Sequence, residues 1–110
     1  MKLPNNKNAY VPLAKLIDYL LSETHSVGKS KAKLLRTVGF NEGNVQMLKK
    51  GLLEIAHTKD VAEVITTLHG VKYVMDGDIR TPVGLVIKMR TIWIIDAGQE
   101  RPRFVTTYPL

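Results

Sequence analysis

Cysteine is absent from the chain of 110 residues, and histidine occurs only three times. The lack of cysteine excludes disulfide bonds, thiolate zinc sites and a cysteine nucleophile. His25, His57 and His69 do not have the spacing of metal ligands on a helix, so we expect no metal site and no cofactor. No apolar run approaches the roughly 18 residues of a membrane span, and the N-terminus lacks the apolar core of a signal peptide. These absences predict a cytoplasmic protein without membrane contact, unless the chain was cut from a larger exported protein.

Acidic residues are outnumbered, with 10 Asp and Glu against 16 Lys and Arg, which gives a formal net charge of +6. The excess lies at the start, because residues 1–40 hold seven of the bases and two of the acids. A basic region of this kind favours a polyanionic partner such as RNA, DNA or an acidic protein. The alternative is a basic protein whose charges serve only solubility.

The length predicts one domain, 1–110, with a helical part at about 11–57 and a sheet part at about 61–109. Apolar residues at helical spacing predict three helices. These helices are expected in residues 13–21, 30–38 and 41–57. Ser30 and Asn41 are expected to cap the second and third helices, because their side chains can accept from free backbone N–H groups.

Alternating apolar and polar residues, rich in β-branched side chains, predict four strands. These strands are expected in residues 61–68, 71–76, 84–95 and 103–108. Asp60 and Glu63 have capping-box spacing, so a short helix is the alternative for the first strand. Asp76-Gly77-Asp78 is interpreted as a turn after the second. Helices followed by strands predict an α+β fold, with about three N-terminal helices packed on one face of a four-stranded antiparallel meander.

The third strand divides its side chains between two faces. Its apolar set is expected in the core and comprises Leu85, Ile87, Met89, Trp93 and Ile95. Lys88 and Arg90 therefore point outwards, towards solvent or a ligand. In the last strand, Phe104, Thr106 and Tyr108 are expected to share one face. Whether Arg90 lies on that same face depends on the register, which a slip of one residue reverses.

The polar segment between the first two helices contains Gly28, Lys29 and Ser30, which match the end of a P-loop. Nucleotide hydrolysis is excluded, because the glycine five residues earlier and the preceding strand are missing. A glycine and several lysines before a helix are still typical of an anion site, and a solvated loop is the alternative. His25, in the same loop, is a candidate proton-transfer group. Lys31 borders an apolar stripe, so it either reaches solvent or points into a groove.

Residues 25–32, His-Ser-Val-Gly-Lys-Ser-Lys-Ala, resemble a motif of a small bacterial domain of unknown function, often His-Pro-x-Gly-x-x-Lys-Ala. Residues 90–95 and 102–109 resemble the end of that domain, which contains Val-Thr-x-Tyr-Pro, and the opening Lys-Leu-Pro-Asn is similar too. Ser26 departs from the pattern, since proline is usual there. The layout of this domain is similar to that of the barnase–EndoU–colicin–RelE superfamily of small ribonucleases and toxin domains.

This resemblance implies a toxin-associated, metal-independent endoribonuclease in which the ribose 2′-OH attacks the adjacent phosphate. The catalytic residues that it implies are His25, Lys31, Arg90, Thr106 and Tyr108. His25 would be the general base or acid. Lys31 and Arg90 would stabilise the phosphorane, and Thr106 would hydrogen-bond the phosphate. Tyr108 would stack on a base or donate a proton. Phosphate and RNA contacts are expected from Gly28, Lys29, Lys33, Lys88 and Arg103.

Two alternatives to a ribonuclease stay open. The first is a non-catalytic RNA-binding or protein-interaction domain with the same fold. The second is an accessory domain of a phage or mobile-element protein. Expected partners are RNA and an acidic inhibitor protein. An immunity or antitoxin role is not expected, because a protein that neutralises a basic nuclease is acidic on its matching face and this chain is basic. The sequence defines no oligomeric state.

Overall fold

Helices fill the first half of the chain and strands the second, so the α+β prediction is confirmed. The computed structural model describes all 110 residues. Its helical elements are η1 (Asn6–Asn8), α1 (Leu13–Lys15), η2 (Leu16–Leu20), α2 (Lys29–Thr37), η3 (Glu42–Asn44) and α3 (Val45–Thr58). Its strands are β1 (Glu63–Thr67), β2 (Gly70–Arg80), β3 (Val86–Asp96) and β4 (Arg103–Pro109). None of the helices is long and apolar enough to span a membrane.

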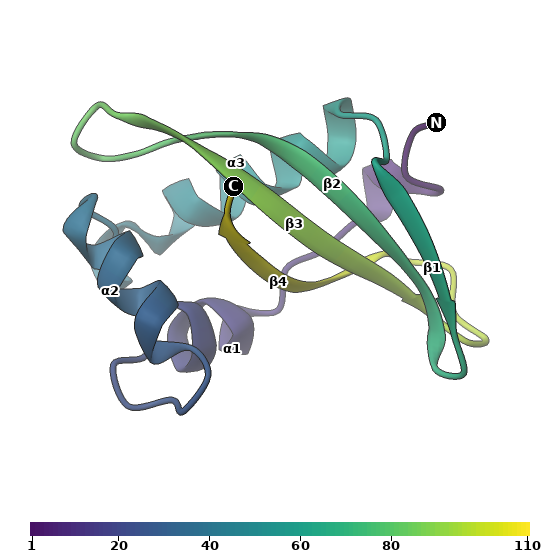
Figure 1. The fold of residues 1–110 in the computed structure, drawn as a ribbon, viewed down its shortest axis with the longest axis horizontal. Helices are drawn as coiled ribbons and strands as arrows, with labels where there is room; N and C mark the ends of the chain where they lie inside the picture. Colours follow the sequence, from purple (N-terminus) through teal and green to yellow (C-terminus); the bar gives the residue numbers. More distant parts are fainter.

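The strands form one antiparallel sheet in the order β1-β2-β3-β4, the meander expected from the sequence. In Figure 1, α3 passes behind the sheet, while α1 and α2 lie to the side of β4. The sheet face turned towards the viewer carries no helix. One face is therefore packed on helices, and the other, called the open face below, is available for a ligand.

Trp93 of β3 is fully buried at the centre of the core. Its ring packs edge to face on Phe104, with ring centroids 5.4 Å apart. The Trp93 Nε1–H donates to the Thr91 hydroxyl over 2.9 Å, and that hydroxyl donates to the Met75 carbonyl over 2.7 Å. The polar groups around this ring are thus hydrogen-bonded, which offsets the cost of removing them from water.

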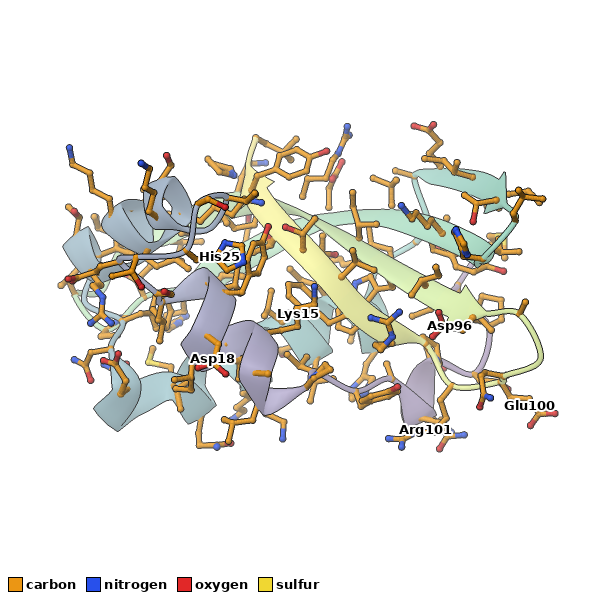
Figure 2. All side chains as sticks on the ribbon, turned by 90° about the horizontal axis from the view of Figure 1, so that it is seen from below. Lys15, Asp18, His25, Asp96, Glu100 and Arg101 are labelled. Carbon is orange, nitrogen blue, oxygen red and sulfur yellow. The ribbon has the colours of Figure 1, made fainter.

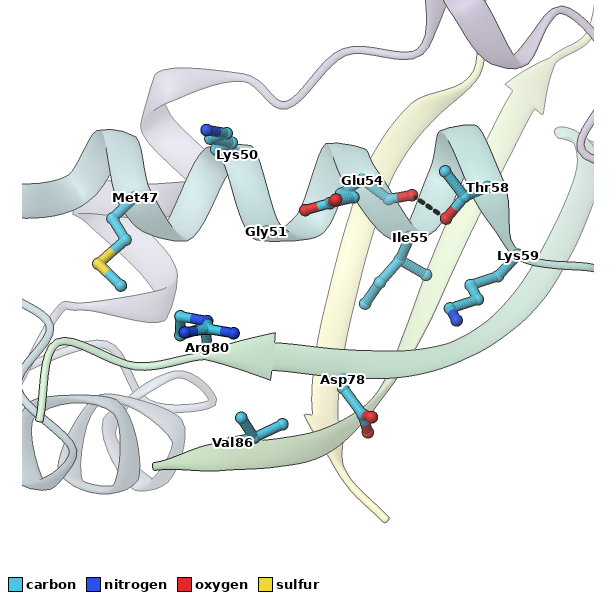
Figure 3. A pocket seen from close by; sticks show the side chains of 10 residues that line it. All are labelled: Met47, Lys50, Gly51, Glu54, Ile55, Thr58, Lys59, Asp78, Arg80 and Val86. Carbon is cyan, nitrogen blue, oxygen red and sulfur yellow. Dashed lines mark hydrogen bonds between the residues drawn. The ribbon is translucent and has the colours of Figure 1, made fainter. Parts of the chain in front are cut away.

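Two glycines allow α3 to approach the sheet closely. Gly51 of α3 faces Ile79 of β2, and Gly77 of β2 faces Ile55 of α3. A Cβ atom on Gly77 would lie 2.7 Å from Ile55 Cγ1, which is closer than real Cβ contacts. Figure 3 shows α3 running along β2 with Ile55 pointing towards the strand. The distance between the helix and the sheet is therefore short because both positions are glycine.

The helix boundaries differ in part from the prediction. The Asn41 side chain acts as a cap, since it accepts from the Gly43 N–H over 2.7 Å, although it caps the short η3 just before α3. The expectation that Ser30 caps α2 is wrong, because the helix begins one residue earlier and no side chain caps it. The first helix ends in a wide π turn, in which the Leu21 N–H donates to the Leu16 carbonyl. Apolar spacing alone does not distinguish this turn from an α-helix.

β2 is longer than the sequence indicates. Asp76-Gly77-Asp78 lies inside this strand, so its interpretation as a turn is wrong. Asp76 pairs with Arg90 across the strands, and Gly77 leaves space for α3. Both contacts favour a strand that continues through these residues. The chain turns later, between β2 and β3, and Leu85 is 59% exposed there rather than in the core. The first strand forms as expected, and the alternative helix does not.

A bulge in the β3–β4 pair changes which side chains of β4 share a face. Thr106 pairs with Ile92 and Phe104 pairs with Trp93, so β4 has one extra residue between these two pairs. Phe104 is buried in the core, while Thr106 is on the open face with Tyr108. The prediction that all three share one face is therefore wrong for Phe104. An extra residue reverses the alternation, and strict period-two counting does not detect it.

Candidate functional site

Three polar groups meet where η2, α2 and β4 come together, and we call them the Lys31 cluster. The Lys31 Nζ donates to the Tyr19 hydroxyl and to the Thr106 hydroxyl, each over 2.7 Å. The two hydroxyls are 2.8 Å apart and hydrogen-bond to each other. The cluster therefore contains a cation and two hydroxyl groups that can donate or accept protons.

Lys31 differs in its partners from three of the arginines. Arg36, Arg90 and Arg103 each form an ion pair with a carboxylate. Lys31 has no carboxylate oxygen within 4.0 Å of its Nζ, although its side chain is half-buried. Hydroxyl groups hold its position without neutralising it. The cluster therefore presents an unopposed positive charge, which attracts an anion.

The phenol of Tyr19 lies between two lysines. The Nζ atoms of Lys15 and Lys31 are each 5.1 Å from the centroid of its ring. Burial raises the pKa of Tyr19, but the hydrogen bonds from Lys31 and Thr106 and the charges of both lysines outweigh it. The pKa of Tyr19 therefore lies below that of an ordinary tyrosine. This makes the phenol easier to deprotonate than a free one.

His25 packs edge to face on Tyr19, with ring centroids 5.0 Å apart. The backbone N–H groups of Val27 and Gly28 both donate to His25 Nδ1 over 3.0 Å. Nδ1 therefore carries its lone pair, and in the neutral ring the proton is on Nε2. This arrangement favours a donor at Nε2 over a proton acceptor there.

Gly28 holds the loop against the first helix. Its N–H is already bound to His25, so it is not free for a phosphate. A Cβ atom at this position would lie 2.1 Å from the Tyr19 carbonyl oxygen, so no larger residue fits without movement. Gly28 thus positions His25 beside Tyr19 and does not itself present an anion-binding group.

Arg90 and Tyr108 extend the site along the open face. They are direct partners in the β3–β4 register, and the Tyr108 ring centroid is 6.0 Å from the Lys31 Nζ. Asp76 accepts two hydrogen bonds from Arg90, 2.8 Å from Nε and 2.9 Å from Nη2. These bonds raise the pKa of Arg90 and hold the pKa of Asp76 below its usual range. The pair fixes the position of the guanidinium on the open face.

The five residues expected to bind phosphate or RNA are not all in one place. Lys88 lies on the open face two residues from Arg90. Arg103 pairs with Asp96 and lines a cleft beside the Lys31 cluster. Lys29 and Lys33 do not reach the cluster, since both line a separate hollow on the far side of α2. Helical spacing explains this, because residues two apart point in nearly opposite directions.

The cleft beside the cluster has a volume of about 700 Å³ and lies between the first helix and β4. Tyr19, His25 and Thr106 line it. Figure 2 shows Lys15 and His25 between these two elements. A second hollow of about 560 Å³ lies between α3 and β2, where basic and acidic side chains alternate (Figure 3). It contains none of the expected site residues. No group of three or more His, Asp or Glu is arranged to hold a metal ion.

Sequence reasoning missed three residues of the site. Tyr19 and Lys15 are four apart on one helical face, a spacing that places a cation near a ring. The sequence does not predict a role for Tyr19, because only the apolar residues of its helix follow a recognisable pattern. The sequence predicts a turn at Asp76, although its charge is opposite to that of Arg90, as expected for a cross-strand pair.

The fold and site define a small helix-and-sheet domain with a cationic cluster at its open strand face. The chain belongs to the family described as Domain of unknown function (DUF6883), whose model matches residues 2–110. No curated protein matches the chain. A chain of the contact-dependent growth inhibition toxin–immunity protein complex from Klebsiella pneumoniae 342 is similar in structure, with a TM-score of 0.75 and 17% identity. The likeness covers 94% of this chain and 95% of that chain, and it concerns the fold alone.

Proposed function

We propose that this chain is a toxin-associated endoribonuclease that cleaves RNA by transesterification without a metal ion. The unopposed charge of Lys31 carries the proposal, because a half-buried cation held only by hydroxyls is suited to an anionic group. The structural neighbour supports the toxin context, since it comes from a complex of a growth inhibition toxin with its immunity protein. RNA and an acidic inhibitor protein are the partners, and the cytoplasm is the place of action.

The chemistry needs no group beyond those present in the chain. The ribose 2′-oxygen attacks the adjacent phosphorus and a new O2′–P bond forms. The P–O5′ bond breaks, which leaves a 2′,3′-cyclic phosphate and a free 5′-hydroxyl. One proton leaves the 2′-OH and one joins the departing 5′-oxygen, so the step is balanced. Negative charge grows on the phosphoryl oxygens and must be stabilised.

Lys31 and Arg90 supply that stabilisation. Both approach the open face near Tyr108, and both are fixed by hydrogen bonds before substrate arrives. The Thr106 hydroxyl lies 2.7 Å from the Lys31 Nζ, and its proposed role is to hydrogen-bond a phosphate oxygen bound by Lys31. Such prearranged donors contribute most of the acceleration in many enzymes.

Tyr19 is the best proton acceptor for the 2′-OH, because its pKa is lowered and its hydroxyl belongs to the Lys31 cluster. His25 contributes the donor on Nε2, at the edge of the same cleft. Tyr108 stacks on a base or donates the proton to the leaving oxygen. The proposal thus assigns the proton acceptor to the Lys31 cluster and the proton donors to His25 and Tyr108.

The test is an RNA cleavage assay in EDTA with the wild-type protein and the His25→Ala and Arg90→Ala variants. We expect fragments ending in 2′,3′-cyclic phosphate from the wild type, and at least a 100-fold slower reaction from each variant. Circular dichroism and thermal melting show that the variants stay folded. Lys29→Ala is the matched control, since Lys29 lies on the far side of α2. Intact RNA with the folded wild type would overturn the proposal and favour RNA binding without cleavage.

A further inference from the structure

The second half of β2 has no neighbouring strand on one of its two sides. β1 pairs with residues 70–74 of β2 and then ends, while β2 continues to Arg80. The Val74 carbonyl accepts from the Ala62 N–H, so the backbone groups of Val74 face the side of β1. Their direction alternates along a strand, so those of Asp78 and Arg80 face the same side. We call this stretch the free edge of β2, and its N–H and C=O groups are available to another strand.

The hollow between α3 and β2 lies beside this free edge. Its volume is about 560 Å³, and Asp78 and Arg80 line it from β2 (Figure 3). Lys50, Glu54 and Ile55 line it from α3. A strand added to the free edge would direct every second side chain towards α3. The hollow therefore provides space for the side chains of an extended segment that hydrogen-bonds to β2.

The charges on the free edge favour one kind of segment. Asp78 and Arg80 are two residues apart in β2, both are exposed, and neither forms an ion pair. Opposite charges that face each other on neighbouring strands are favourable, and like charges are unfavourable. A complementary segment thus places an acidic residue opposite Arg80 and a basic residue opposite Asp78.

The direction of the segment follows from β1, which occupies the same side of β2 and runs antiparallel to it. In an antiparallel segment, the residue opposite Arg80 comes two positions before the residue opposite Asp78. The complementary sequence is therefore an acidic residue, any residue and then a basic residue.

A second copy of this chain does not fit on the free edge. α3 packs against β2, because Gly51 faces Ile79 and Gly77 faces Ile55. Two free edges paired with each other would bring the two β2 strands to about 4.8 Å and their α3 helices nearly as close. Packed helices need about 8–10 Å between their axes. The occupant is therefore a segment of another protein that has no helix beneath it.

We infer that the free edge of β2 binds an extended segment of a partner protein, which adds a strand antiparallel to β2 and carries an acidic and a basic residue two positions apart. The hollow contains none of the residues assigned to the proposed reaction, so the inference does not rest on RNA cleavage.

Amide hydrogen exchange of the full chain tests the inference. In the free chain, the amides of Asp78 and Arg80 should exchange fast, and those of Gly77 and Ile79, which face β3, should exchange slowly. The probe is the capped synthetic peptide Thr-Val-Glu-Thr-Lys-Val-Thr. The peptide should slow exchange at Asp78 and Arg80, because their N–H groups then donate to its backbone.

A second peptide, in which Glu and Lys are exchanged, separates specific pairing from general stickiness. It should bind the wild type about tenfold more weakly, because both cross-strand pairs become like-charged. The double variant Asp78→Arg with Arg80→Asp should reverse this preference. Glu100→Arg is the matched control, since Glu100 is exposed and lies outside the strands (Figure 2), and it should keep the preference of the wild type.

Four results would each overturn the inference. These are unchanged exchange at Asp78 and Arg80, slowing confined to β1, equal binding of the two peptides, and a preference that the double variant does not reverse. The first of these would mean that the charges serve only to prevent pairing of the edge. The two peptides are compared on the wild type, so the test stands even where the double variant does not fold.

Discussion

The Tyr19 phenol is surrounded by groups that affect its proton. Lys15 comes from its own helix, Lys31 from α2, His25 from the loop between them and Thr106 from β4. Asp18, next to Tyr19 in the chain, lines the same cleft and is the one carboxylate that does so. The positive charges and hydrogen bonds prevail, because the pKa of Tyr19 is lowered in spite of its burial. A tyrosine in this setting serves as a proton acceptor at a lower pH than a free phenol does.

Replacing Tyr19 with Phe should lower kcat at least 100-fold, the range for loss of a general base. The ring and its contact with His25 remain, so binding changes less than kcat. In the wild type the rate should rise with pH and level off below the ordinary pKa of tyrosine, since the base acts when deprotonated. The Tyr19→Phe profile should lack that rise. An unchanged profile would contradict the role, and Tyr10→Phe, which removes a hydroxyl elsewhere, is the control.

The loop from Ser22 to Gly28 determines where His25 lies. Ser22 Oγ accepts from the His25 N–H over 3.1 Å, and the His25 ring accepts from two N–H groups later in the loop. Gly28 closes the loop against the Tyr19 carbonyl. Hydrogen bonds to His25 and the close approach of Gly28 to the Tyr19 carbonyl therefore fix the conformation of the loop.

Gly28→Ala should disturb this loop, because its new methyl group would meet the Tyr19 carbonyl oxygen at 2.1 Å. Backbone atoms cannot move aside as a side-chain end can, so we expect a loss of about 1–3 kcal/mol in the free energy of unfolding. Cleavage should fall as well, since His25 moves with the loop. Urea unfolding and the cleavage assay measure the two effects. Ser26→Ala, in the same loop at an exposed position, should change neither.

The sequence predicts the elements better than the contacts between them. Period and turn residues are local properties, and they predict three helices, four strands and the outward direction of Lys88 and Arg90. Thr106 and Phe104 lie on different faces of the sheet because of a bulge. The bulge forms when the strands pair, so the spacing of apolar residues in the sequence does not indicate it. Tyr19 joins Lys31 only after the helices pack against β4, so its role depends on tertiary contacts.

At the scale of the whole molecule, three arginine–carboxylate pairs make the free energy of unfolding depend on pH in the acidic range. Hydrogen bonds from their arginine partners hold the pKa values of Asp76, Asp96 and Glu42 below the ordinary values. The unfolded chain therefore binds more protons than the folded chain over the acidic range. These pairs stabilise the fold fully above the ordinary carboxyl pKa, and the contribution is lost as the pH falls through the lowered values.

The free energy of unfolding should thus decrease as the pH drops from about 5 to about 2. Urea unfolding at several pH values measures this decrease. Asp96→Asn should make the dependence shallower, because its carboxylate no longer exchanges a proton. An equally steep dependence in that variant would show that the pair does not contribute. Asp60→Asn is the control, since Asp60 is exposed and its ion pairs are longer.

The cluster of Tyr19, Lys31 and Thr106 joins segments that are 75 and 87 residues apart along the chain. Closing loops of this length comes late in folding, because the entropy of distant segments must be lost before their contacts form. The proposed catalytic arrangement therefore requires complete folding, because Lys31 and Tyr19 meet Thr106 only when β4 has docked.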